Sequence, residues 1–165
     1  WLIPRQLLKR AGGWNEQLSL NNDFEFSIRL LLHAKYVHYV PGALIYYRSG
    51  SPSLSAIKSE LSFKKAIHSA RLGCCYLLEV ENSLLMRRLC ANKLCFWLFE
   101  MYPDYPALIR ELENDIKMLG GANRKLDDSR LMHFIQFFVG WKNAKLIKTG
   151  FYRSNFGRFI KRVKS

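Results

Sequence analysis

A carboxylate stands where a polar loop is predicted to meet a helix. Asp23 follows Asn21 and Asn22 and comes directly before a stretch whose apolar residues recur at helical spacing. The start of a helix favours the ionised form of a nearby carboxylate, and an ionised carboxylate held in place can take the proton of a hydroxyl group as that hydroxyl reacts. The alternative role is structural, because Asp and Asn also cap the free N–H groups of a first helical turn.

Short helices and strands are predicted around this carboxylate. Pro4 precedes the first helix, and Gly12 and Gly13 follow its end, as is typical of helix boundaries. Alternating apolar residues after the second helix predict two short strands separated by Pro41 and Gly42. The predicted elements of this third of the chain are helices at 5–10 and 22–34, strands at 36–40 and 44–47, and a loop at 49–53.

The rest of the chain has the pattern of long amphipathic helices. Pro103 and the pair Gly120-Gly121 mark two of the breaks between them. The predicted helices span 56–79, 82–101, 104–119 and 128–147. We therefore expect a mainly α chain with one short pair of β-strands, long enough at 165 residues to bury a core.

Several pieces of the N-terminal third, taken in order, resemble the second half of a family 2 glycosyltransferase catalytic domain. These pieces are residues 1–5, 11–16, 21–26 with Arg29, 40–41 and 46–48. The resemblance implies the α/β GT-A fold of nucleotide-diphospho-sugar transferases and a reaction that inverts the anomeric centre. The later helices are similar to C-terminal helical regions of a bacterial subgroup, which implies a role in cell-surface polysaccharide biosynthesis.

The resemblance assigns roles to five residues. Asp23 matches the acidic residue that serves as general base, the group that deprotonates the acceptor hydroxyl. Trp14, Asn22 and Glu25 are assigned to acceptor binding, with packing as the alternative for Trp14 and orientation of a neighbour as the alternative for Glu25. Arg48 is assigned to the diphosphate leaving group through charge-assisted contacts. Many relatives have an acidic residue at the position of Asn22, so the usual acidic pair is incomplete here.

The resemblance covers only the acceptor side of that domain. The family binds its nucleotide-sugar, and a divalent metal (Mg or Mn) through an Asp-x-Asp motif, in the N-terminal half, which we expect to precede Trp1. Ser49 and Gly50 follow Arg48, where related sequences place a metal-binding histidine, so we assign no metal ligand. The expected regions are 1–55 as part of the catalytic domain, 56–147 as a helical extension and 148–165 as a basic aromatic tail. We expect this stretch by itself to be inactive.

The charge of the chain indicates an anionic partner. It has 26 Lys and Arg against 13 Asp and Glu, a net charge of +13, which favours a membrane surface, nucleic acid or phosphorylated substrates. Beyond Asp128 there is no acidic residue, and basic residues alternate with aromatic ones. This pattern over 142–165 favours an anionic membrane surface over nucleic acid, and the alternative is a basic face packed on the protein.

These observations lead to two hypotheses. The first is a membrane-associated glycosyltransferase at the inner face of the cytoplasmic membrane, which transfers a sugar from a nucleotide-sugar to a saccharide or lipid-linked acceptor. The second is a non-enzymatic basic helical module that binds anionic membrane or nucleic acid. The four cysteines lack metal-binding spacing and fit buried free thiols in a reducing cytoplasm.

Overall fold

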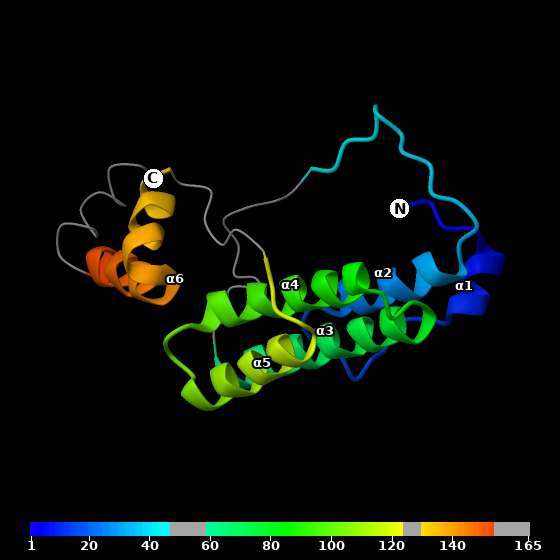
Figure 1. Cartoon of the computed structure of the whole chain (residues 1–165). Coiled ribbons are helices and arrows are strands. Elements are labelled where there is room, and N and C mark those ends of the chain that lie inside the picture. The colour runs from blue at the N-terminus through cyan, green and yellow to red at the C-terminus, as the bar shows by residue number, and fades with distance from the viewer. Residues whose placement is uncertain (47–58, 124–129, 154–165) are drawn as a thin grey trace.

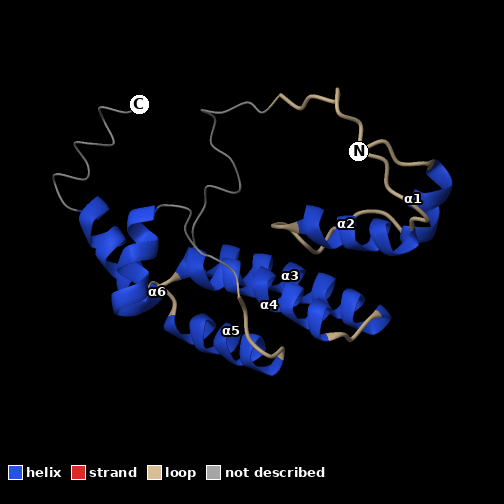
Figure 2. Ribbon diagram, turned by 45° about the horizontal axis from the view of Figure 1, so that its top comes forward, coloured by secondary structure: helices blue, strands red, loops and turns tan. Residues whose placement is uncertain are grey.

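The computed structural model describes residues 1–46, 59–123 and 130–153. These residues form helices and loops only, which confirms the mainly α prediction (Figures 1 and 2). The helices are α1 (Arg5–Ala11), α2 (Asn22–His33), α3 (Glu60–Val80), α4 (Leu84–Met101), α5 (Pro106–Met118) and α6 (Arg130–Arg153).

The long helices begin at residues that suit a helix start. The Ser59 hydroxyl accepts a hydrogen bond from the Ser62 N–H at 3.2 Å at the start of α3, and the Ser83 hydroxyl accepts one from the Met86 N–H at the same distance at the start of α4. Each bond satisfies an N–H group that the helix itself leaves free. Pro106 is the first residue of α5, where its fixed φ costs nothing.

The predicted strand pair is wrong for the part of it that the structure describes. Residues 36–46 form a loop that arches away from the helices in Figures 1 and 2, and Tyr47 lies outside the described residues. A strand needs backbone partners on a neighbouring strand, and none is present among the described residues. Large apolar side chains are therefore left exposed: Tyr36, Val37, Tyr39, Val40, Leu44, Ile45 and Tyr46.

The main core lies among α3, α4 and α5, which run side by side in Figures 1 and 2. Apolar side chains of all three helices meet in this core. The buried members are Phe63, Ile67, Ala70, Leu94, Leu98, Met101, Leu108, Ile109 and Leu112. This core fixes the surface on which the N-terminal helices pack.

Helix α2 packs against α3 and forms a smaller apolar cluster with α1. Ala11, Phe26 and Leu30 are buried in this cluster, and Ile3 and Leu7 pack against it. At the contact with α3, a Cβ placed on Gly73 would lie 2.6 Å from Cε1 of Phe24. The missing side chain of Gly73 therefore lets the Phe24 ring approach α3 closely.

Helix α6 is longer than predicted and is interrupted. It runs over Arg130–Arg153 in place of 128–147, and Gly140 has a non-helical backbone with φ 73°. After this break the Trp141 ring packs near Phe99 of α4 and near Tyr102, the residue that follows α4, with ring centroids 6.2 and 5.3 Å apart. The part of the basic tail beyond Arg153 lies outside the described residues.

Candidate functional site

The site predicted around Asp23 is built on a buried ion pair within α2. The Glu25 side chain is 1% exposed, and its carboxylate receives two hydrogen bonds from the Arg29 guanidinium, one turn later, at 2.6 and 3.0 Å. Hydrogen bonding to Glu25 raises the pKa of Arg29. A bidentate pair of this kind is both strong and directional, so it holds Arg29 in one orientation.

Arg29 in turn holds the glycine turn that precedes α2. Its guanidinium donates hydrogen bonds to the carbonyl oxygens of Ala11 and Gly13, the latter at 2.8 Å. Gly12 has φ 78°, a conformation that glycine adopts without strain, and a Cβ there would lie 3.2 Å from Arg29 Nη1. The resemblance included Arg29 without a role, and the structure makes it the link between the turn and α2.

Trp14 lies directly after this turn and stacks on α2. Its ring and that of Phe26 have centroids 4.3 Å apart and are inclined by 23°. Trp14 nevertheless remains 53% exposed. Its packing role is therefore present, and it leaves half of the residue accessible to a ligand. Phe26 lies three residues after Asp23, a spacing that makes the two residues neighbours on a helix surface.

Asp23 is exposed in the first turn of α2. Within the described part of the chain no hydrogen bond or ion pair engages its carboxylate, and the N-cap residue, Asn21, makes no side-chain capping bond. Asp23 therefore makes no capping hydrogen bond with the described residues, in contrast to the structural alternative. The carboxylate is open to solvent at a helix start, where the backbone N–H groups favour a negative charge.

The other predicted site residues are Asn22, Glu25 and Arg48, and the structure describes the first two. Asn22, next to Asp23, is half-buried. Glu25 is enclosed and engaged by Arg29, so the structure gives it a part in the support of the site. Arg48 lies outside the described residues. Asn22 and Asp23 thus lie in the first turn of α2, and Trp14 contacts the same helix through Phe26.

Two residues of the helical region reach this loop, and the sequence patterns did not identify them. The Ser69 hydroxyl donates to the carbonyl oxygen of Asn21 at 2.6 Å, and the Lys93 ammonium donates to Asn21 Oδ1 at 3.3 Å. Ser69 lies among the apolar residues Ala66, Ile67 and Ala70 of α3, and Lys93 directly precedes the apolar stretch Leu94–Leu98 of α4. That contrast was the available signal, although it does not name the partner.

The residues that the structure describes do not fit a metal site. No group of three or more His, Cys, Asp or Glu side chains is close enough to hold an ion in that part of the chain. The divalent metal implied by the resemblance therefore has no ligands among them.

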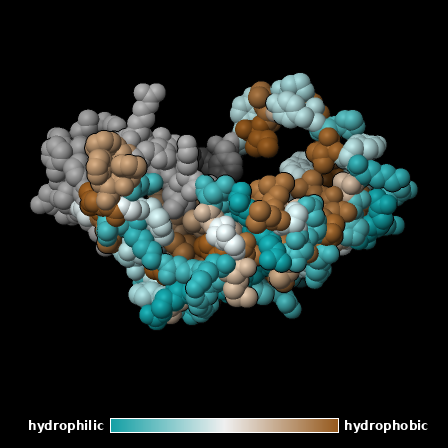
Figure 3. Space-filling model, in the orientation of Figure 1, coloured by the Kyte–Doolittle hydropathy of each residue, from teal (hydrophilic) through white to brown (hydrophobic). Residues whose placement is uncertain are grey.

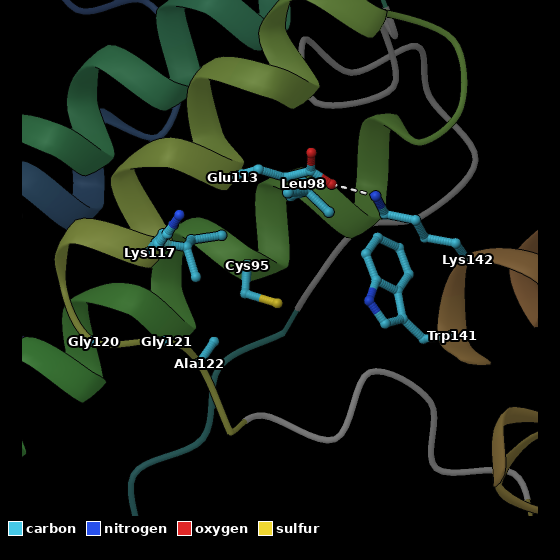
Figure 4. Close-up of a pocket in the computed structure, with 10 residues that line it drawn as sticks. Cys95, Leu98, Glu113, Lys117, Gly120, Gly121, Ala122, Trp141 and Lys142 are labelled. Atoms are coloured by element: carbon cyan, nitrogen blue, oxygen red, sulfur yellow. Dashed lines mark ion pairs between the residues drawn. The ribbon is translucent and has the colours of Figure 1, made fainter.

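A cavity of about 660 Å³ lies elsewhere, between α4, α5 and α6 (Figure 4). Cys95 and Leu98 line it from α4, and Trp141 lines it from α6. An ion pair of 2.5 Å between Lys142 and Glu113 joins α6 to α5 at its edge. Among the described residues of the predicted site, none lines this cavity.

Two of the basic residues in the described part of α6 contact α5 and α4. Lys142 pairs with Glu113, and the Lys145 ammonium lies 4.0 Å from the centre of the Phe99 ring, so both face the helical body. Phe134, Phe137 and Phe138, before Gly140, are 65, 85 and 67% exposed, and Leu146 and Ile147, after it, are 42 and 53% exposed. Apolar surface is visible on α6 at the left of Figure 3.

None of the helices described has the length and apolar character that crossing a bilayer requires. Comparison with protein-family models, with curated proteins and with solved structures gave no match for this chain. Its function is therefore argued from the residues and their geometry.

Proposed function

We propose that this chain is the acceptor side of an inverting glycosyltransferase of the GT-A fold, with Asp23 as general base. The observation that carries the proposal is an exposed carboxylate, in the first turn of α2, that no hydrogen bond or ion pair engages among the described residues. Arg29 ties the same helix to the glycine turn, and the half-exposed ring of Trp14 stacks on Phe26 of that helix. A carboxylate that accepts no hydrogen bond from the protein is available to a substrate hydroxyl. An aromatic ring with one accessible side suits the C–H surface of a sugar.

In this mechanism the acceptor hydroxyl attacks the anomeric carbon of a nucleotide-sugar in a single in-line displacement. Asp23 takes the hydroxyl proton as the new C–O bond forms, and the bond from the sugar to the diphosphate breaks. Arg48 holds the diphosphate that leaves with the electron pair of that bond. Asn22 and Trp14 bind the acceptor, which we assign as a saccharide or a lipid-linked saccharide.

The exposed loop over 36–46 supports the α/β part of the proposal. Its alternating apolar residues have the pattern of strands, but the described residues offer no sheet to pair with. In the proposed GT-A domain these residues pack against a sheet and complete it. The Asp-x-Asp motif of the family does not occur in the 165 residues, so the proposed activity belongs to a protein that also supplies the donor site.

The test uses the complete reading frame that contains these residues, assayed for transfer from nucleotide-sugars. Asp23→Asn should lower kcat by at least about 100-fold, since a general base contributes roughly that factor or more, while the circular dichroism spectrum stays unchanged. Glu79→Gln removes an exposed carboxylate from α3 and should leave kcat unaltered. Full activity of Asp23→Asn would remove Asp23 as the base.

A second candidate function is attachment to an anionic membrane surface. The exposed aromatic cluster of Phe134, Phe137 and Phe138 favours it, because an exposed apolar patch on a chain of net charge +13 suits an anionic bilayer surface. This location corresponds to a peripheral protein at the inner face of the cytoplasmic membrane. This candidate surface adds the aromatic residues before Gly140 to the basic aromatic segment 142–165 that the sequence indicates.

Sedimentation with lipid vesicles tests this attachment. The chain should bind anionic phosphatidylglycerol vesicles but not neutral phosphatidylcholine vesicles. Replacing the three phenylalanines with Ser should abolish binding. Leu84→Ser with Leu85→Ser removes exposed apolar residues from α4 and should have no effect. Binding that survives the phenylalanine replacements would exclude this surface, and DNA binding by the same chain would favour the nucleic-acid alternative.

A further inference from the structure

We infer that Ser69 and Lys93, on α3 and α4, position the Asp23 carboxylate by anchoring the residues on either side of it. The inference rests on the proposed function for the role of Asp23 as a base, whereas the anchoring itself rests on contacts between described residues. Under this inference, α3 and α4 contribute residues that support the candidate site.

The first anchor holds Asn21, two residues before Asp23. Three hydrogen bonds converge on it: the Ser69 hydroxyl donates to its carbonyl oxygen at 2.6 Å, its own amide donates to the carbonyl oxygen of Ala66 at 3.4 Å, and Lys93 donates to its Oδ1 at 3.3 Å. Ser69 is completely buried. A buried hydroxyl at this distance restricts the Asn21 carbonyl to one position.

The backbone of Asn21 makes this anchor effective. Its φ of 56° is left-handed, the only such value among the non-glycine residues described. Its carbonyl oxygen also accepts the N–H of Phe24 at 3.2 Å, which closes the first turn of α2 around Asp23. The same oxygen thus joins the Ser69 hydroxyl to the turn that carries Asp23, and an uncommon conformation of this kind persists where surrounding contacts enforce it.

The second anchor holds Phe24, the residue after Asp23. Its ring lies against Gly73 of α3, where a Cβ would come within 2.6 Å of Cε1. The Lys93 ammonium lies 4.0 Å from the centre of the same ring, a cation–π distance. Lys93 therefore contacts both anchors, Asn21 through a hydrogen bond and Phe24 through its ring.

With both neighbours held against the helical core, Asp23 has little freedom of its backbone while its side chain stays exposed. Transfer of a proton in a displacement reaction depends on sub-ångström placement of the base, and a base supported by a rigid second layer keeps that placement. Ser69 and Lys93 are thus positioning residues that act through Asn21 and Phe24.

The experiment combines Ser69→Ala and Lys93→Met with two readouts. In the 165-residue chain, hydrogen exchange of the amides at 22–24 should accelerate by about tenfold on loss of one such hydrogen bond, while exchange in α5 stays unchanged. In the complete protein, each variant should lower kcat with little change in KM for the donor, and Lys93→Arg should restore most of it. Lys65→Met, which removes an exposed lysine of α3, is the matched control.

A double variant separates positioning from general stabilisation. If Ser69 acts through Asp23, Ser69→Ala should reduce kcat in the natural chain and add no further loss to Asp23→Asn. Equal losses in both backgrounds, or unchanged exchange at 22–24, would overturn the inference. A complete protein whose transfer does not depend on Asp23 would instead refute the proposed function, and the exchange measurement would still decide the anchoring.

Discussion

The ion pair of Glu25 and Arg29 shows how a charged residue can be kept inside a small helical chain. Burial of a carboxylate is costly unless its oxygens are satisfied, and here one guanidinium satisfies both while its remaining hydrogens bind two carbonyl oxygens. Glu25 in this arrangement stabilises the glycine turn through Arg29 and is not available to a substrate. The exposed Asp23, two residues earlier, has the opposite character.

Replacing Arg29 with Met should lower the free energy of unfolding by about 3 kcal/mol, because the Glu25 carboxylate would stay buried without its counter-charge. Urea denaturation followed by circular dichroism measures this loss. Adding Glu25→Met should recover part of it, since replacing both members of a pair is far less costly than replacing one.

The control for this prediction is Lys64→Met, which breaks the exposed ion pair between Lys64 and Glu60. Exposed pairs contribute little, so its urea midpoint should match that of the natural chain. If Arg29→Met were as stable as Lys64→Met, the ion pair of Glu25 and Arg29 would contribute nothing to stability.

The thiol of Cys74 should react slowly with alkylating reagents. Its hydrogen bond with Cys90 and its burial raise the pKa of Cys74, and only the thiolate is nucleophilic. With iodoacetamide at pH 8, the exposed neighbour Cys75 should therefore be labelled well before Cys74, as peptide mass spectrometry can measure. Labelling of both at one rate in the folded chain would contradict this packing.

At the scale of elements, the contact between α2 and α3 determines where the candidate site lies. Gly73 would normally weaken a helix, yet it lies in the middle of α3 where the Phe24 ring packs. Gly73 lowers the helix propensity of α3, but it allows α2 to approach α3 closely.

Gly73→Ala tests this exchange. The added methyl group would overlap the Phe24 ring at 2.6 Å, and overpacking of this kind costs about 1–3 kcal/mol, which exceeds the gain of roughly 1 kcal/mol in helix propensity. We expect a lower urea midpoint. Gly150→Ala, in α6, is the control: no atom lies within 4 Å of the new Cβ, so the urea midpoint should rise or stay the same. Equal stabilisation by both changes would show that the Phe24 ring moves aside without cost.

At the scale of the whole molecule, the core of α3, α4 and α5 is the base on which α2 and the second part of α6 rest. Asn21 and Phe24 contact it from the α2 side, and Trp141 contacts it from the α6 side. The candidate site therefore depends on the same core as the cavity beside α6.

Leu112→Ala should remove a large share of the total stability. Leu112 is fully buried in this core, and truncation of such a residue costs about 2–5 kcal/mol out of roughly 5–15 kcal/mol for a domain. Leu84→Ala, at 66% exposure on α4, is the control and should change the urea midpoint little. Similar midpoints for the two variants would contradict the assignment of this core.

The sequence by itself determined the helices, their approximate ends and the position of Asp23 at a helix start. These features follow from local patterns: Pro4 and Gly12 bound α1, Gly120 follows the end of α5, and apolar residues recur at helical spacing. The break at Gly140 and the absence of strands over 36–46 were not predicted, because a glycine is tolerated inside many helices and a strand depends on a partner elsewhere.

Only the tertiary structure decided what surrounds Asp23. Glu25 proved to be a buried partner of Arg29, and Asn21 is held by Ser69 and Lys93, which follow it by 48 and 72 residues. Such contacts depend on how α3 and α4 pack against α2. A pattern within one helix shows which side is apolar, but it does not contain the distance or direction of a residue on another helix.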